Sequence, residues 1–259
     1  EQGDLNLALW GGHGDVPRIV IAPGSVEDCF YQTIRAFNMA EKYQMPVILL
    51  TDQSLAHRTQ TMLRPDPSKI ELVERLQAGA GNGDYKRFAV TATGISPIGI
   101  PGHEGTTYVA PGLEHDEYGH PQYDSETHTV MTEKRFRKLE VAAANDAGPV
   151  ERSGVDEPTI GIVGWGSSEG PIREAVERAV AAGYRVAALY PKVLNPLAVA
   201  EISTFVASVK HLLVPEVNYM GQFANHLAAT FGVKPLRINK YGGFPFTSAE
   251  IFRAVEEAA

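Results

Sequence analysis

The chain has 259 residues, of which 44% are hydrophobic and 21% are charged, a balance typical of a folded globular protein and not of a disordered one. Its 23 Lys and Arg against 31 Asp and Glu residues give a net charge of -8, which argues against a nucleic-acid partner because binding to phosphates needs a basic surface. No apolar run reaches the length of a membrane span and no signal peptide is recognisable, so we expect no membrane partner. The single cysteine, Cys29, cannot form an internal disulfide or hold an iron–sulfur cluster, which favours a cytoplasmic location.

The first region begins with a strand, a helix and a second strand. The apolar run over residues 19–22 predicts a buried parallel strand, and Ser25 with Asp28 resembles a capping box that starts a helix. Apolar residues recur at helical spacing over residues 30–43, and residues 46–52 predict a second buried strand. A helix N-terminus after a strand also attracts phosphate, but one glycine and two acids at this corner favour a capped helix.

Residues 63–154 form a long loop-rich connection, with many Gly, Pro, His and acidic residues and one helix expected over residues 131–144. This connection supplies no further strands to the first pair. Since a buried parallel sheet needs several strands with helices on both faces, we expect upstream or partner polypeptide to complete the sheet that residues 1–62 begin.

Residues 155–259 alternate regularly between strand and helix patterns. The expected strands cover residues 160–164, 184–189, 211–214 and 236–239, and the expected helices cover residues 171–182, 196–208 and 220–231, with a closing helix that starts at the capping box Thr247–Glu250. This alternation predicts a doubly wound α/β domain. The whole chain is therefore expected to be α/β.

The glycine-rich stretch from Gly164 to Gly170 has two interpretations. Residues 166–170 match the Gly-x-Ser-x-Gly nucleophile elbow, with Ser168 as nucleophile and Glu216 and His226 following in hydrolase order. The alternative is a turn in which serine caps a helix, and the lack of an oxyanion segment favours it.

Acids and histidines concentrate at His115-Asp116-Glu117 and at His120, within the loop-rich connection. They suggest metal ligands, but Gly119 and Pro121 argue against the helix that a His-Glu-x-x-His site needs. We therefore expect no metal here. The polar density favours a functional loop that meets a substrate or a subunit.

Five of the polar residues that precede the first strand are candidates for a site: Gln2, Asp4, His13, Asp15 and Arg18. Their place at a sheet end, beside the missing part of the sheet, predicts an active-site rim or a subunit interface. Alternatively, Arg18 simply pairs with Asp15 where the strand begins.

An ordered series of segments along the whole chain resembles the alpha subunit of the 2-oxoacid:ferredoxin oxidoreductases, in particular the C-terminal portion of the 2-oxoglutarate branch. The segments are Glu-Gln-Gly-Asp-Leu at 1–5, His-Gly-Asp-Val-Pro-Arg at 13–18, Ala-Pro-Gly-Ser-Val-Glu-Asp-Cys-Phe at 22–30, Ala-Phe-Asn-Met-Ala-Glu-Lys-Tyr-Gln at 36–44, Pro-Val-Ile-Leu-Leu-Thr-Asp at 46–52, Thr-Gly-Ile-Ser-Pro at 93–97 and Glu-His-Asp-Glu-Tyr-Gly-His at 114–120.

This resemblance implies a fold and an activity. Residues 1–62 would be the second half of a Rossmann-like thiamine-pyrophosphate pyrimidine-binding domain, here incomplete, and residues 155–259 a transketolase C-terminal-like domain. The reaction would be oxidative decarboxylation of 2-oxoglutarate, or another 2-oxoacid, with CoA to acyl-CoA, carbon dioxide and reduced ferredoxin, reversible in some members. Thiamine pyrophosphate with Mg and the iron–sulfur cluster would sit on a partner beta subunit, with none bound by this chain alone.

The resemblance also implies that the family's cofactor-facing glutamate and substrate-binding arginine lie in an upstream N-terminal segment. No confident catalytic residue is therefore expected within this chain, which would not be active alone. Gln2 and Asp4 would lie at the rim of the substrate pocket, and His13, Asp15 and Arg18 at that rim or at the subunit interface. Ser96, His115, Asp116 and Glu117 would lie in loops that reach the active-site entrance. The alternatives are a non-catalytic scaffold subunit and, less favoured, a serine hydrolase that uses Ser168.

Overall fold

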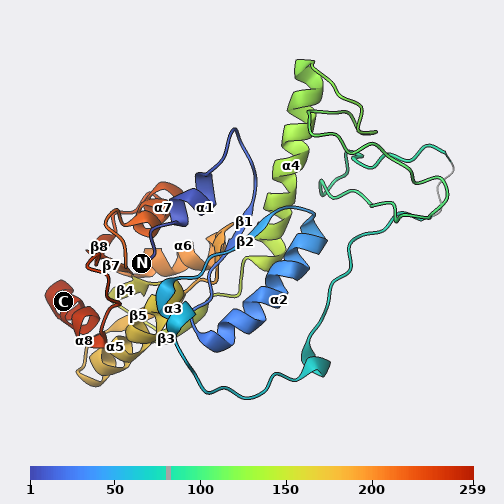
Figure 1. Ribbon diagram of the computed structural model, residues 1–259. Coiled ribbons are helices and arrows are strands. Elements are labelled where there is room, and N and C mark those ends of the chain that lie inside the picture. Colours follow the sequence, from blue (N-terminus) through green and yellow to red (C-terminus); the bar gives the residue numbers. More distant parts are fainter. Residues whose placement is uncertain (80–82) are drawn as a thin grey trace.

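The computed structural model describes residues 1–79 and 83–259, and it contains two β-sheets with helices packed on them (Figure 1). The first sheet is built on β1 (Ile19–Ile21), which pairs in parallel with β2 (Val47–Leu49). Helix α2 (Val26–Tyr43) connects them, and its N-cap Ser25 accepts a hydrogen bond from the Asp28 amide. The predicted parallel strand–helix–strand unit and its capped helix are confirmed.

A third strand joins this sheet from the far end of the chain. β6 (Val193–Asn195) pairs antiparallel with β1, so that the sheet order is β2-β1-β6. Helices α2 and α4 (Ser125–Asp146) bury Ile19 and Ile21 together with Val193. Among the described residues no strand lies beyond β2, which is therefore an edge of the sheet.

The second sheet has the order β3-β5-β4-β7-β8. All of its strands are parallel except β3, which pairs antiparallel with β5. The strands are β3 (Glu151–Gly154), β4 (Ile160–Val163), β5 (Val186–Tyr190), β7 (His211–Glu216) and β8 (Leu236–Asn239). The four parallel strands run in the spatial order second, first, third, fourth. The predicted doubly wound α/β arrangement is confirmed, and its chain order reverses between β4 and β7.

Helices cover both faces of the second sheet. One face packs on α5 (Glu169–Ala181) and α8 (Ser248–Ala258), through side chains such as Ile172 and Ile251. The other face packs on α6 (Val199–Ser208), α7 (Gln222–Phe231) and α1 (Leu5–Trp10). Since α1 belongs to the N-terminal segment, Leu5 and Leu9 share a core with Phe223 of α7. The N-terminal segment is thus packed against the second sheet through α7.

Several predicted bounds shift for local reasons. Helix α4 begins at Ser125, six residues before the expected start, because Asp124 accepts a hydrogen bond from the Thr127 amide and caps it. The predicted strand over residues 46–52 stops at Leu49, since Asp52 turns the chain into the short helix α3 (Gln53–His57). The two capping-box hydrogen bonds expected for the closing helix, between Thr247 and Glu250, are present.

An extended segment leaves α3, passes the short turn η1 (Pro67–Lys69), and returns to one end of α4 (Figure 1). Residues 83–124 then fold as loops against that end of the helix. Throughout residues 1–79 and 83–259, every helix is too short or too polar to span a bilayer.

Candidate functional site

The carboxyl ends of the parallel strands meet where the two sheets come together. In open α/β sheets, ligands bind outside these ends, at the point where the strand order reverses. That point lies between β4 and β7, and Gln2 occupies it. The Gln2 Nε2 atom donates to the Trp165 carbonyl at 2.8 Å, and its Oε1 accepts from the Val217 amide at 2.9 Å. The N-terminal segment therefore closes the crevice of the doubly wound sheet with a side chain that is only 3% exposed.

Asp52 joins the same crevice from the end of β2. One carboxylate oxygen accepts from the Leu55 amide at 3.1 Å and caps α3, and the other accepts from the Ser167 amide at 3.0 Å. Between these contacts Gly166 has a φ of +59° in the turn η2 (Gly166–Ser168), and a Cβ there would lie 2.8 Å from Gln2 Nε2. Only glycine combines this backbone with the close approach of the first region.

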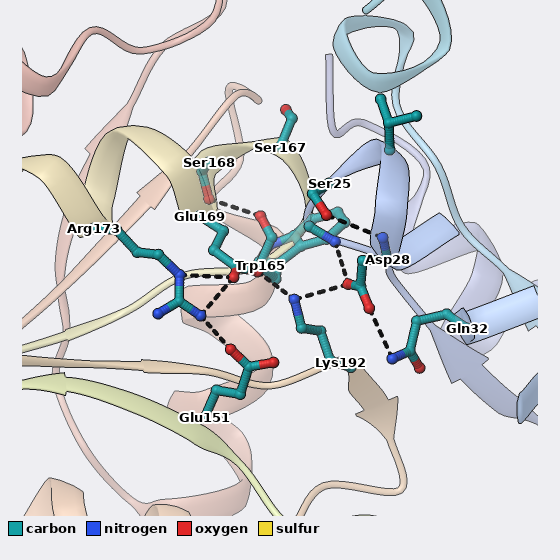
Figure 2. Close-up of polar contacts among 12 residues, drawn as sticks. Ser25, Asp28, Gln32, Glu151, Trp165, Ser167, Ser168, Glu169, Arg173 and Lys192 are labelled. Carbon is teal, nitrogen blue, oxygen red and sulfur yellow. Dashed lines mark hydrogen bonds and ion pairs between the residues drawn. The ribbon is translucent and has the colours of Figure 1, made fainter. Parts of the chain in front are cut away.

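A chain of alternating charges lies beside this crevice, largely buried at Lys192, Asp28 and Glu169 and exposed at Glu151 (Figure 2). The Lys192 ammonium contacts Asp28 Oδ2 at 2.8 Å and also contacts Glu169, whose carboxylate accepts from Arg173. Arg173 in turn pairs with Glu151 of β3. Burial lowers the pKa of Lys192, but Glu169 and Asp28 outweigh that effect, so its pKa lies above the usual value and the bridge is charged.

A cavity of about 280 Å³ opens next to the crevice. Its polar wall comes from α3 and η2, and its apolar wall from Val217 just after β7 and from the loop that joins β8 to α8. The lining side chains include Gln53, Ser54, His57, Ser167, Val217, Phe244 and Pro245. Strand carboxyl ends, a few polar groups and apolar walls are the usual features of a ligand site.

The structure does not form the Ser168 relay. The Ser168 hydroxyl is buried and donates to the Trp165 carbonyl at 2.7 Å. Glu216 accepts from the Phe223 and Ala224 amides at 2.7 and 3.0 Å, so it caps α7. Burial raises the pKa of Glu216 and lowers that of His226, and no hydrogen bond joins either side chain to Ser168. The stretch is a glycine-rich turn, as the alternative interpretation held, but the predicted serine cap is wrong: Ser168 stands at the N-cap of α5 without a side-chain capping bond, because its hydroxyl is used by the Trp165 carbonyl.

The other residues that precede β1 lie away from the crevice, at the surface. Asp4, His13 and Asp15 are exposed, and Asp4 precedes α1 without a side-chain capping bond. Arg18 is half-buried, and its Nε donates to the Val16 carbonyl at 3.3 Å with no ion pair to Asp15. Asp15 and Arg18 line a separate cavity of about 390 Å³ with Trp10 and Phe136 among its apolar walls. Of the five rim candidates, only Gln2 is in the crevice.

The loop candidates hold their own loops together, at the end of α4 away from the strand ends (Figure 1). The buried Ser96 hydroxyl donates to the Ala89 carbonyl at 2.7 Å, and the His115 ring lies 4.0 Å from that of Phe88. Asp116 accepts from the Tyr118 and His120 amides. Glu117 binds Lys86 and the Val90 amide, which together hold the pKa of this carboxyl below its usual range.

The sequence analysis did not identify two residues near the crevice as site residues. Asp52 was included only as the last residue of a strand, and Lys192 was not singled out. The signal that marks both of them is a polar residue two or three positions after an apolar strand. Such a residue falls at the carboxyl edge of the sheet, where the crevice lies.

Comparison with protein-family models identifies the family of the chain. The family model described as "Pyruvate flavodoxin/ferredoxin oxidoreductase, thiamine diP-bdg" matches residues 1–134. The chain belongs to this family.

The individual relatives are subunits of 2-oxoacid oxidoreductases. The chain is 35% identical to 2-oxoacid:ferredoxin oxidoreductase 2, subunit alpha, of Aeropyrum pernix, over 98% of this chain and 40% of the relative. It is 32% identical to the 2-oxoglutarate oxidoreductase subunit KorA of Mycobacterium tuberculosis, over 100% of this chain and 39% of the relative. The chain thus spans about 40% of the length of these curated relatives.

A solved structure matches nearly the whole chain. It is the 2-oxoglutarate:ferredoxin oxidoreductase from Magnetococcus marinus with 2-oxoglutarate, coenzyme A and succinyl-CoA bound. The TM-score is 0.95 at 43% identity, over 99% of this chain and 45% of the solved one. The predicted family and fold class are confirmed.

The cofactors of the family need a carboxylate that faces the thiamine ring, ligands for a metal ion and thiolates for an iron–sulfur cluster. The three buried carboxylates among the described residues, Asp52, Glu169 and Glu216, are all engaged by amides or cations, which leaves no buried carboxylate to face a thiamine ring. Within residues 1–79 and 83–259 no group of three or more His, Cys, Asp or Glu side chains is arranged to hold a metal ion. One cysteine cannot supply the four thiolates of a cluster. The described residues therefore do not fit thiamine pyrophosphate, its metal ion or the cluster.

Proposed function

We propose that this chain is part of the alpha subunit of a 2-oxoacid:ferredoxin oxidoreductase that acts on 2-oxoglutarate. The overall reaction converts 2-oxoglutarate, CoA and two oxidised ferredoxins to succinyl-CoA, carbon dioxide, a proton and two reduced ferredoxins. The observation that carries this proposal is the match in both fold and sequence, along almost the whole chain, to the Magnetococcus marinus enzyme with 2-oxoglutarate and CoA bound.

The role proposed for this chain is structural support of the active-site rim. Gln2 holds the ends of β4 and β7 together, and Asp52 binds the turn between β4 and α5. These contacts keep the neighbouring polar cavity in one shape, and a preformed cavity loses less entropy when it binds a ligand. Asp4, His13, Asp15 and Arg18 are proposed to form the outer rim or a subunit interface, because they are polar and lie just before β1.

The proposed partners rest on the family to which the chain belongs and on the open edge of β2. An upstream segment of the same subunit is proposed to pair with the open edge of β2 and to bring the thiamine-facing glutamate. A beta subunit is proposed to hold the thiamine pyrophosphate, its Mg and the iron–sulfur cluster, with ferredoxin as electron acceptor. The loops with Ser96, His115, Asp116 and Glu117 are proposed to approach the active-site entrance. The proposed location is the cytoplasm, in keeping with the free thiol of Cys29.

The test is an assay of the complete complex. The purified complex should reduce a viologen dye only when 2-oxoglutarate, CoA and thiamine pyrophosphate are all present, and this chain alone should not. Native mass spectrometry of the same sample should show the chain together with a cofactor-bearing subunit. A complex that stays inactive while another family member works in the same assay contradicts the proposal. A complex that is inactive but intact favours the scaffold alternative.

A further inference from the structure

The contact between Lys192, Asp28 and Glu169 is the least exposed ion pair among the described residues. The side chains are 9%, 15% and 11% exposed, whereas Lys42 and Asp146, in a pair typical of the surface, are 44% and 30% exposed. Removing charges from water is costly, so a buried pair is weak evidence for stability alone. Its position in the fold therefore needs another explanation.

Lys192 stands where three elements from two regions of the chain converge (Figure 2). It follows β5, and its carbonyl accepts from the Ala22 amide at the end of β1. Asp28 lies in the first turn of α2 and Glu169 in the first turn of α5. Each carboxylate stabilises the positive end of its own helix, and the ammonium between them joins the two helix starts.

The packing around the bridge is tight on the side of the first region. The Gly24 amide donates to Asp28 Oδ2 at 2.7 Å, and the other oxygen of Asp28 accepts from Gln32 Nε2 at 2.9 Å. A Cβ on Gly24 would lie 1.9 Å from Glu169 Oε2. The start of α2 and the start of α5 therefore approach each other closely around the Lys192 ammonium.

The turn that Lys192 fixes is the one that contacts the crevice. Glu169 directly follows η2, in which the Ser167 amide binds Asp52, and Trp165 just before it binds Gln2. Resting on the proposed function, we propose that Lys192 is a positioning residue that sets how the first region presents Gln2 and Asp52 to the strand-end cavity. It touches neither substrate nor cofactor and acts through the η2 turn.

The test uses three variants of the complete complex. Lys192→Met removes the bridge, Lys192→Arg keeps its charge, and Arg173→Met is the matched control. Arg173 belongs to the same chain of charges, but its partners Glu169 of α5 and Glu151 of β3 both belong to the second sheet and its helices. Breaking it removes ion pairs without freeing the first region.

The expected result separates positioning from stability. Lys192→Met should raise the KM for 2-oxoglutarate or CoA about tenfold, since small misplacements of binding groups have effects of this size or more. It should also speed amide hydrogen exchange in residues 165–169 and 51–57. Lys192→Arg should restore both properties, and Arg173→Met should leave the KM and the exchange of residues 51–57 as in the wild type.

Two results would overturn the proposal. One is a Lys192→Met complex that matches Arg173→Met in KM and in exchange. The other applies if the Lys192→Met complex does not assemble. The double variant Lys192→Met/Glu169→Gln, which removes one positive and one negative charge and so keeps the net charge, then replaces it. Wild-type KM values in this double variant would refute the positioning role. A wild-type complex without 2-oxoglutarate-dependent activity contradicts the proposed function instead, and the exchange measurement then still tests Lys192.

Discussion

Adding one methyl group at Gly24 should break the buried bridge. The Cβ of Gly24→Ala would lie 1.9 Å from Glu169 Oε2 and 2.8 Å from Lys192 Nζ, well inside van der Waals contact. A carboxylate at the end of a flexible side chain can usually move aside. Here Glu169 is held by Lys192 and Arg173, so any movement separates a buried ion pair.

The cost follows from what is separated. Losing one partner of a buried ion pair destabilises a protein by about 3–5 kcal/mol, and a displaced partner should cost roughly the lower end of that range. For a chain of this size, about 3 kcal/mol corresponds to a fall in Tm of about 6–12 °C.

A thermal melt followed by circular dichroism measures this fall. Gly170→Ala is the matched control, because Gly170 lies in α5 and a Cβ added there would meet no other atom within 4 Å. Alanine is also favoured over glycine in a helix by about 0.5–1 kcal/mol. The control should therefore melt at or slightly above the wild-type temperature. A Gly24→Ala protein that melts with the wild type would show that the bridge can rearrange freely, which refutes the reasoning.

Three further predictions concern other parts of the chain. Burial lowers the pKa of Lys134 from 10.5 to about 7, so above pH 7 the unfolded chain binds more protons than the folded one. The free energy of unfolding should therefore rise with pH by up to about 1.4 kcal/mol per pH unit. Urea unfolding at pH 7 and 9 should show this rise in the wild type and not in Lys134→Met, and equal rises in the two proteins would contradict it. A fluorophosphonate probe should not label the protein, and labelling that disappears in Ser168→Ala would restore the hydrolase. Thr247→Ala should lose about 1 kcal/mol with its cap, measured by urea unfolding, while the exposed Thr230→Ala changes little.

The sequence patterns could predict those elements whose signals are local. β1 and β2 are continuous apolar runs, and the Ser25 cap depends on residues only three positions apart. β6 and β3 were not predicted. β6 is three residues long, and β3 is a polar edge strand whose pairing partner, β5, lies more than thirty residues away along the chain. Such strands exist because a neighbour offers hydrogen bonds, which no local pattern records.

The candidate site could be predicted only in part, for the same reason. A glutamine at position 2 reads as polar and exposed, yet it is buried because β4 and β7 end with groups that match its amide. The burial of Lys192 depends on Asp28 and Glu169, which come from different helices. The role of Gln2 at a substrate rim remains a prediction, as do those of the other rim and loop residues.

The pairing of β6 with β1 has a consequence for how the chain is made. Val193 must leave the ribosome before β1 gains its neighbour on the side opposite β2, so we expect the three-stranded sheet to form only after residues 193–195 have been translated. Nor can the chain be cut near residue 154 into two independently expressed pieces, because the N-terminal piece would expose one side of β1 and the C-terminal piece would lose the α1 contribution to its core.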